Sequence, residues 1–223
     1  RVSFAAEKDM MQDDFDPRTL EGREVHYVIV SEFSTLLSEW SDIGSVRDAA
    51  VVAASGLRSA YWLWLEDDDR AMALLRIVAE QTARIRTWNL KPNIAIKLEG
   101  NPKTTPRDWF EKSGMRRISS FNSALGEMAH ARPKIQWPKA HVLLSELQLG
   151  SDDPHSIHTA RGFALNMATL MLAREVMSTL ENIEPNSADM FREVLGEIRF
   201  DFDSSLELLE EWFDFVHSKN EKN

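Results

Sequence analysis

The sequence predicts an all-α protein, a multi-helix bundle of about seven to eight helices that pair as antiparallel helical hairpins. Apolar residues recur at helical spacing through most of the 223 residues. Strand signals are scarce, because the chain has two tyrosines and no Asn-Gly or Asp-Gly turn. The length suits a single helical domain over residues 1–223, and an internal boundary, if there is one, falls in the loop of residues 89–105.

Two helices are expected over residues 17–40 and 45–65. Asp16 and Pro17 open the first, because aspartate is favoured as an N-cap and proline at the first helical position. Ser45 is the expected N-cap of the second, whose apolar face continues to its end. Both segments have the pattern of helices that bury one side in a bundle.

The acidic stretch EDDD at residues 66–69 separates the second helix from a third, expected over about residues 68–88. Negative charge here favours the N-terminus of the following helix through the helix macrodipole. Because the connection is so short, the two helices are predicted to pack as an antiparallel hairpin.

The middle of the chain is less regular. Residues 89–105 contain two prolines, one glycine and three lysines, which predicts a loop. Within it, IAIKLEG at residues 94–100 is the one segment whose pattern suits a short strand. After it, Thr105 and Pro106 predict the start of a short helix, and MRRISSFNSALGEMAHA predicts a further helix.

The longest helix is expected to begin with Asp153 as N-cap and Pro154 at its first position. Its Ala, Leu and Met content suits burial on several sides, and Pro185 ends it. The acidic region that follows is expected to form two amphipathic helices up to about His217. Its aromatic residues are interpreted as core-packing groups: Phe200, Phe202, Trp212, Phe213 and Phe215.

The composition excludes several classes of function. Without cysteine, the chain has no disulfide, thiolate zinc site or cysteine nucleophile, which suits a reducing cytoplasm. The formal net charge of −10 argues against nonspecific nucleic-acid binding by the whole chain. No apolar run is long enough for a membrane span, so we expect a cytoplasmic protein without membrane contact, and we expect no cofactor.

The stretch LLRIVAEQTARIRTW, residues 74–88, places charges inside an apolar helical pattern. Arg76, Glu80 and Arg84 are spaced by four residues, so they share one side of the helix. One interpretation is an ion-pair ladder in which both arginines flank Glu80. The other is a polar cluster where Arg76 or Arg84 binds a phosphate or carboxylate. The apolar face of this helix is predicted to consist of Leu74, Leu75, Val78, Ile85 and Trp88.

Glu127 and His130 lie three residues apart in SALGEMAHARP, on one face of the expected helix. A glutamate can orient an imidazole and raise its basicity, as proton transfer requires. The same spacing occurs in di-iron bundles, but these need a second Glu-x-x-His, which this chain lacks. Two interpretations are left: a structural polar pair or part of a catalytic site.

His155 and His158 are one helical turn apart, a spacing that could bind a transition metal together with Asp152 or Asp153. The aspartates also stand where N-caps belong, and Pro154 completes that pattern. Both features favour helix capping, with a metal site as the alternative.

Between Lys91 and Lys139 the chain carries ten Lys or Arg residues against four Asp or Glu residues. Such an interval could contact a phosphate backbone and stack a base, or it could be only a solvated face. The candidate nucleic-acid contacts are Arg116, Arg117, Arg132, Lys134, Trp137 and Lys139.

The pairing of LLRIVAEQTARIRTW with the later ALGEMAHARP resembles a pattern in uncharacterised bacterial helical proteins near the HEPN (higher eukaryotes and prokaryotes nucleotide-binding) superfamily. That superfamily includes defence ribonucleases and nucleotide-binding toxin components. The resemblance covers about a third of the chain, and it implies a shared polar cluster of Arg76, Glu80, Glu127 and His130 between two helices. The superfamily's catalytic signature, a histidine four to six residues after an arginine, does not occur here, so the resemblance favours binding over catalysis.

We therefore expect a cytoplasmic bacterial binding module, regulatory or defence-associated, that acts through protein or nucleic-acid contacts. A protein partner or a homo-oligomer is expected, and nucleic acid would contact the basic interval. The alternatives are a HEPN-like ribonuclease that uses the Arg/Glu/His cluster and a helical metalloprotein. The lack of a complete catalytic constellation favours the non-enzymatic role.

Overall fold

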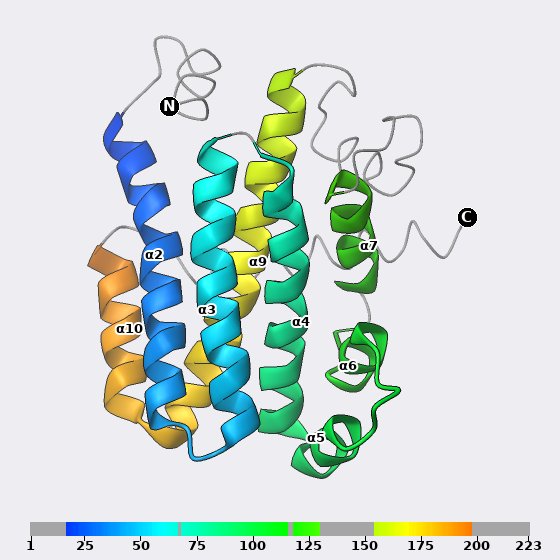
Figure 1. Ribbon diagram of the computed structural model, residues 1–223. Coiled ribbons are helices and arrows are strands. Elements are labelled where there is room, and N and C mark those ends of the chain that lie inside the picture. The colour runs from blue at the N-terminus through cyan, green and yellow to red at the C-terminus, as the bar shows by residue number, and fades with distance from the viewer. Residues whose placement is uncertain (1–16, 67, 116–117, 130–153, 198–223) are drawn as a thin grey trace.

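The computed structural model describes residues 17–66, 68–115, 118–129 and 154–197. Side chains are described over residues 25–66, 68–115, 121–127 and 161–197 and at residue 129. These parts of the chain contain eight helices and no strand, as predicted (Figure 1). The helices are α2 (Pro17–Trp40), α3 (Gly44–Leu65), α4 (Arg70–Leu90), α5 (Pro92–Glu99), α6 (Pro106–Lys112), α7 (Ile118–Ala129), α9 (Pro154–Ile183) and α10 (Pro185–Glu197).

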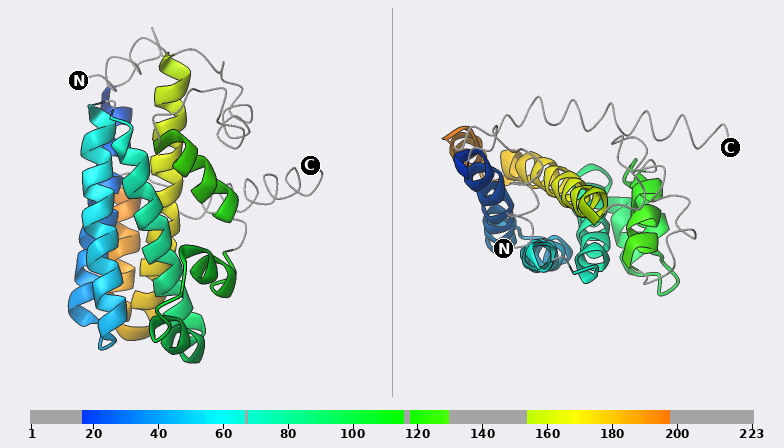
Figure 2. Two further views of the ribbon diagram at one scale, coloured as in Figure 1. Left: turned by 45° about the vertical axis from the view of Figure 1, so that its right-hand side comes forward. Right: turned by 90° about the horizontal axis from the view of Figure 1, so that it is seen from above.

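Four long helices, α2, α3, α4 and α9, form the central bundle (Figures 1 and 2). Short turns join α2 to α3 and α3 to α4, so each of these pairs is antiparallel. α10 lies against α2 and α9, while α5, α6 and α7 lie on the other side of α4 (Figure 2). α4 therefore stands between the bundle and the short helices and contacts both.

α3 packs through small side chains. Ala50, Ala53 and Ala60 are fully buried. Gly56 faces α4 so closely that a Cβ on this residue would lie 3.1 Å from Val78 Cγ2. Small side chains let neighbouring helix backbones approach, and the buried cluster that includes them extends from α2 to α10.

The predicted helix starts are correct where a proline marks them. Three helices begin at their predicted prolines: Pro17, Pro106 and Pro154. The prediction that Ser45 caps α3 is wrong, because α3 begins at Gly44. The Ile43 carbonyl oxygen already accepts the Val46 N–H at 3.0 Å, so the N-cap is Ile43, without a side-chain hydrogen bond.

The acidic turn supports the start of α4 through Asp68, which precedes the N-cap residue Asp69. The Asp68 carboxylate accepts the backbone N–H of Arg70 at 2.8 Å and three further hydrogen bonds from Nε and Nη2 of the Arg70 guanidinium. The guanidinium first, and then the backbone N–H, hold the pKa of Asp68 below its usual range. Negative charge therefore lies at the start of α4, as the sequence predicts.

The prediction of a loop with one short strand at residues 89–105 is wrong, because Pro92 opens the helix α5. In this helix Ala95 is fully buried, whereas Ile96 is 57% exposed. The contacts of α5 with α4 and α6 cover this one face. An eight-residue helix is marginal by itself, so these tertiary contacts decide the conformation.

α9 has 30 residues and is the longest helix of the described ranges, as predicted. α9 ends at Ile183, and Pro185 is the first residue of α10 rather than only a terminator. None of the helices that the structure describes combines the length and the apolar character needed to span a membrane. The expected aromatic helices beyond residue 197, with Phe200, Phe202, Trp212, Phe213 and Phe215, lie outside the described residues.

Candidate anion-binding site between α4 and α7

The predicted ion-pair ladder on α4 forms only in part. Arg84 Nη2 donates to Glu80 Oε1 at 3.0 Å, and Arg84 Nη1 lies 3.5 Å from Glu99 Oε1 of α5. The same guanidinium lies over the buried ring of Trp109 of α6, 5.0 Å from its centroid. Glu80 is therefore paired with Arg84, and the predicted bridge from Arg76 to Glu80 is wrong.

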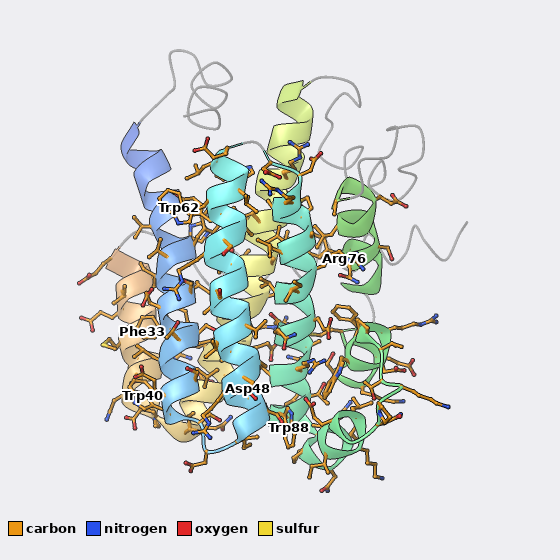
Figure 3. The ribbon with its side chains drawn as sticks, viewed as in Figure 1. Phe33, Trp40, Asp48, Trp62, Arg76 and Trp88 are labelled. Carbon is orange, nitrogen blue, oxygen red and sulfur yellow. The ribbon has the colours of Figure 1, made fainter. Side chains whose placement is uncertain are left out.

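Arg76 points instead to α7, where it lies against Gly126 (Figure 3). A Cβ on Gly126 would lie 3.5 Å from Arg76 Nη1, 3.6 Å from Cζ and 3.7 Å from Nε. These are ordinary van der Waals distances, so the guanidinium lies about one methyl group away from the α7 backbone at Gly126. α4 and α7 therefore pack against each other at the level of Arg76 and Gly126.

Arg76 has no hydrogen bond or ion pair within the described residues. Its Nε is buried without an acceptor, while the residue as a whole stays half-buried. The other arginines of the described ranges that are not exposed all have an acidic partner: Arg84, Arg86, Arg161 and Arg174. A partly buried guanidinium without an acceptor is costly, because it has lost water and gained no hydrogen bond.

Asn122 adds a second polar group to the same face of α7. It precedes Gly126 by four residues, so the two residues lie one turn apart along one side of the helix. The Oδ1 atom of Asn122 is buried and has no hydrogen-bond partner within the described residues. The facing sides of α4 and α7 thus hold an unused donor and an unused acceptor.

The four residues that the resemblance groups together are only partly described. Arg76 and Glu80 lie on α4, and Glu127, half-buried, follows Gly126 on α7. Two helices therefore carry three of the residues, as implied. His130 lies outside the described residues, so its place relative to Arg76 stays a prediction.

The six candidate nucleic-acid contacts of the basic interval also lie outside the described residues: Arg116, Arg117, Arg132, Lys134, Trp137 and Lys139. In sequence they flank α7 at both ends. Arg116 and Arg117 directly precede Ile118, and the others follow Ala129 within ten residues.

The two candidate metal ligands, His155 and His158, belong to the first turns of α9. Their side chains lie outside the described part of the chain, so the metal interpretation stays a prediction. Among the side chains that are described, no group of three or more His, Asp or Glu residues could hold a metal ion.

Two polar contacts were missed in the sequence. Buried Glu175 of α9 accepts hydrogen bonds from Arg86 of α4 at 2.7 Å and from Arg174 at 2.9 Å. His26 of α2 and Asn166 of α9 are joined at 3.1 Å between Nε2 and Oδ1. The one signal for the Glu175 contacts was an acidic residue within the apolar run of α9. No sequence signal indicated the contact between His26 and Asn166.

The chain matches no protein-family model, no curated protein and no solved structure. The resemblance to the HEPN superfamily therefore stays a prediction that rests on the residues of α4 and α7.

Proposed function

We propose that the chain is a helical binding module that takes a phosphate group of a single-stranded nucleic acid on Arg76. The observation that carries this proposal is the guanidinium of Arg76, which rests on Gly126 with a buried Nε and no acceptor in the described ranges. Glu80, the nearest candidate partner in sequence, is used by Arg84. An anion from outside the chain would supply the missing acceptor.

Arginine suits phosphate better than lysine does, because its planar fork donates two parallel hydrogen bonds to phosphate oxygens. The position of the guanidinium opposite Gly126, between two packed helices, restricts this fork before the ligand arrives. Such preorganisation lowers the entropy that binding must overcome. The Asn122 amide, one turn away, offers a further hydrogen-bonding group for a sugar or base.

The charge distribution supports a nucleic acid as the source of the phosphate. α7, which carries Gly126, is flanked in sequence by the arginines and lysines of the basic interval. Phosphates repeat along a strand, so a strand held at Arg76 brings further phosphates that basic side chains can bind. The net charge of −10 restricts such contact to a local surface.

The test is fluorescence anisotropy of a short labelled single-stranded RNA with the whole chain. Arg76→Gln should weaken binding roughly tenfold or more, because a hydrogen bond to a charged group contributes about 1.5–3 kcal/mol. Gly126→Val should weaken it similarly, because the added side chain fills the surface on which the guanidinium rests. Arg192→Gln on the exposed side of α10 is the matched control and should change little.

Thermal unfolding separates binding from structure. Arg76→Gln should leave the free energy of unfolding unchanged or raise it, since it removes a half-buried charge without an acceptor in the described structure. Equal RNA affinity in the Arg76→Gln variant and the wild type would refute the proposal. RNA cleavage that disappears in both Arg76→Gln and His130→Ala would instead establish the ribonuclease alternative, and selective binding of an acidic peptide would replace the nucleic acid by a protein.

A further inference from the structure

The outer side of the α2–α3 pair is a second exposed surface, away from Arg76 of α4 (Figure 1). In the described part of the chain α2 contacts α3, α9 and α10, and α3 contacts α2, α4 and α9, so no further helix covers this side (Figure 2). We call it the α2–α3 face. It is defined by five exposed residues: Val28, Glu32, Val51, Arg58 and Trp62.

The face carries exposed apolar side chains on both sides of a central charged pair. Val28 is 43% exposed, Val51 50% and Trp62 56%. Arg58 Nη1 donates to Glu32 Oε1 at 2.8 Å, and both side chains are about half exposed. Figure 3 shows Trp62 on the side of α3 that adjoins α2. Large apolar side chains that gather on one face are typical of an interaction surface.

Three contacts fix the register of α2 against α3. The rings of Tyr27 and Tyr61 lie 5.4 Å apart, and Ser34 Oγ donates to the Ala50 carbonyl at 2.9 Å. The Glu32–Arg58 pair lies between them. In this register Val28 stands level with Trp62, one turn from the ion pair, and Val51 lies about two turns beyond Arg58 on the other side.

From this pattern we propose that the α2–α3 face binds a second copy of the same chain, across a two-fold axis parallel to the two helices. Such an axis leaves each residue at the same height along the helices. It places α2 of one copy on α3 of the other. Val28 then meets Trp62 of the second copy. Glu32 meets Arg58 of the second copy, and the reverse pairs form by symmetry, as in any isologous interface.

Charge complementarity favours a second copy of the chain as the partner, and it favours the two-fold axis parallel to α2 and α3. Each copy offers one acid and one base at the same level, so the parallel two-fold axis produces a ring of four charges that alternate in sign. An axis across the helices at the level of the ion pair would place Arg58 on Arg58 and Glu32 on Glu32 of the second copy, so like charges would meet. Exposed Ser55, between Arg58 and Val51, is small and leaves room on α3 for α2 of the second copy.

The test measures molar mass by light scattering and by sedimentation over a wide concentration series of the whole chain. The wild type should be a dimer at the upper concentrations. Arg58→Glu and Glu32→Arg should each weaken the dimer by roughly tenfold or more, because like charges then meet across the axis. Arg192→Glu, a charge reversal on α10, is the matched control and should keep the wild-type mass.

Mixing the two single variants gives the decisive measurement. Within each variant the charges at positions 32 and 58 still repel, but between the variants every contact is attractive. The mixture should therefore recover a heterodimer although neither variant dimerises alone. Circular dichroism confirms that each variant is folded. A wild type that is monomeric at all concentrations, a dimer insensitive to both reversals, or a mixture that stays monomeric would each overturn the proposal, whether or not Arg76 binds RNA.

Discussion

Arg86 of α4 and Glu175 of α9 form an ion pair of 2.7 Å in which the carboxylate is 1% exposed. Arg174 donates to the same oxygen at 2.9 Å, and Arg86 Nε also donates to the Ser113 carbonyl, just after α6, at 3.0 Å. The buried charge of Glu175 is therefore balanced by two arginines. Through Arg86 it ties the central bundle to the short helices.

Arg86→Met should lower the free energy of unfolding by about 2 kcal/mol, because Glu175 then keeps only Arg174 as a partner. The methionine keeps much of the apolar stem, so the loss reports mainly the charge and its hydrogen bonds. Urea unfolding measures it. Arg192→Met breaks an exposed ion pair and should cost about 0–1 kcal/mol. Equal losses in the two variants would show that burial of Glu175 adds nothing.

Gly162→Ala should destabilise the bundle by about 1–3 kcal/mol, because overpacking a core forces neighbouring groups to shift. A Cβ on Gly162 would lie 3.0 Å from Cζ2 of Trp64, a rigid ring that is 5% exposed. Gly196→Ala on α10 has open space around it and should stabilise the helix by up to about 1 kcal/mol. Opposite signs in chemical unfolding are the expected result, and two gains in stability would contradict the close approach of α9 to Trp64.

Arg84→Lys should cost about 1 kcal/mol although it keeps the charge, because the guanidinium lies over Trp109 while it pairs with Glu80 and Glu99. An ammonium group cannot keep all three contacts. Arg47→Lys, an exposed position on α3, is the control and should be neutral. The idea fails if thermal unfolding shows the same midpoint for both variants and the wild type.

The start of α6 should make stability depend on acid pH. Asp108 accepts the Thr105 backbone N–H at 2.8 Å and its hydroxyl at 2.7 Å, and these bonds, the backbone one first, lower the pKa of Asp108. The folded pKa lies below the unfolded value of about 4, so the stabilisation is complete above that pH and is lost as the pH falls through the folded pKa.

Asp108→Asn removes this charge. Its unfolding midpoint should lie below that of the wild type at neutral pH, and the difference should shrink as the pH falls below about 4. Asp189→Asn, an exposed aspartate of α10, is the control for a charge change alone. A difference between Asp108→Asn and the wild type that does not vary with pH would contradict this account.

The fold class and most helix starts could be predicted. Proline marks a helix start because its ring fixes φ near the helical value, and because the first N–H groups of a helix have no partner within the helix, so its missing N–H costs nothing there. α5 could not, because Ile94 and Ile96 alternate as in a strand and the helix has only eight residues. Its buried face is set by contacts with α4 and α6. The residue pattern of α5 alone does not reveal these tertiary contacts.

The spacing of Arg76, Glu80 and Arg84 correctly placed the three residues on one helix but not their partners. A glutamate that precedes its basic partner by four residues pairs better than one that follows it, so Glu80 selects Arg84. That Arg76 rests on Gly126 depends on the packing of α7 against α4. The Arg86–Glu175 pair spans 89 residues, and no local spacing could have indicated it.

The hairpin of α3 and α4 also has a consequence for the order in which the molecule assembles. Only residues 66–69 separate these helices, whereas α9 joins them from a point many residues later in the chain. Contacts between sequence neighbours close small loops, which are entropically cheap and fast to form. We expect α3 and α4 to associate early in refolding and α9 to dock late, so that the Arg86–Glu175 bond becomes a marker of the final step.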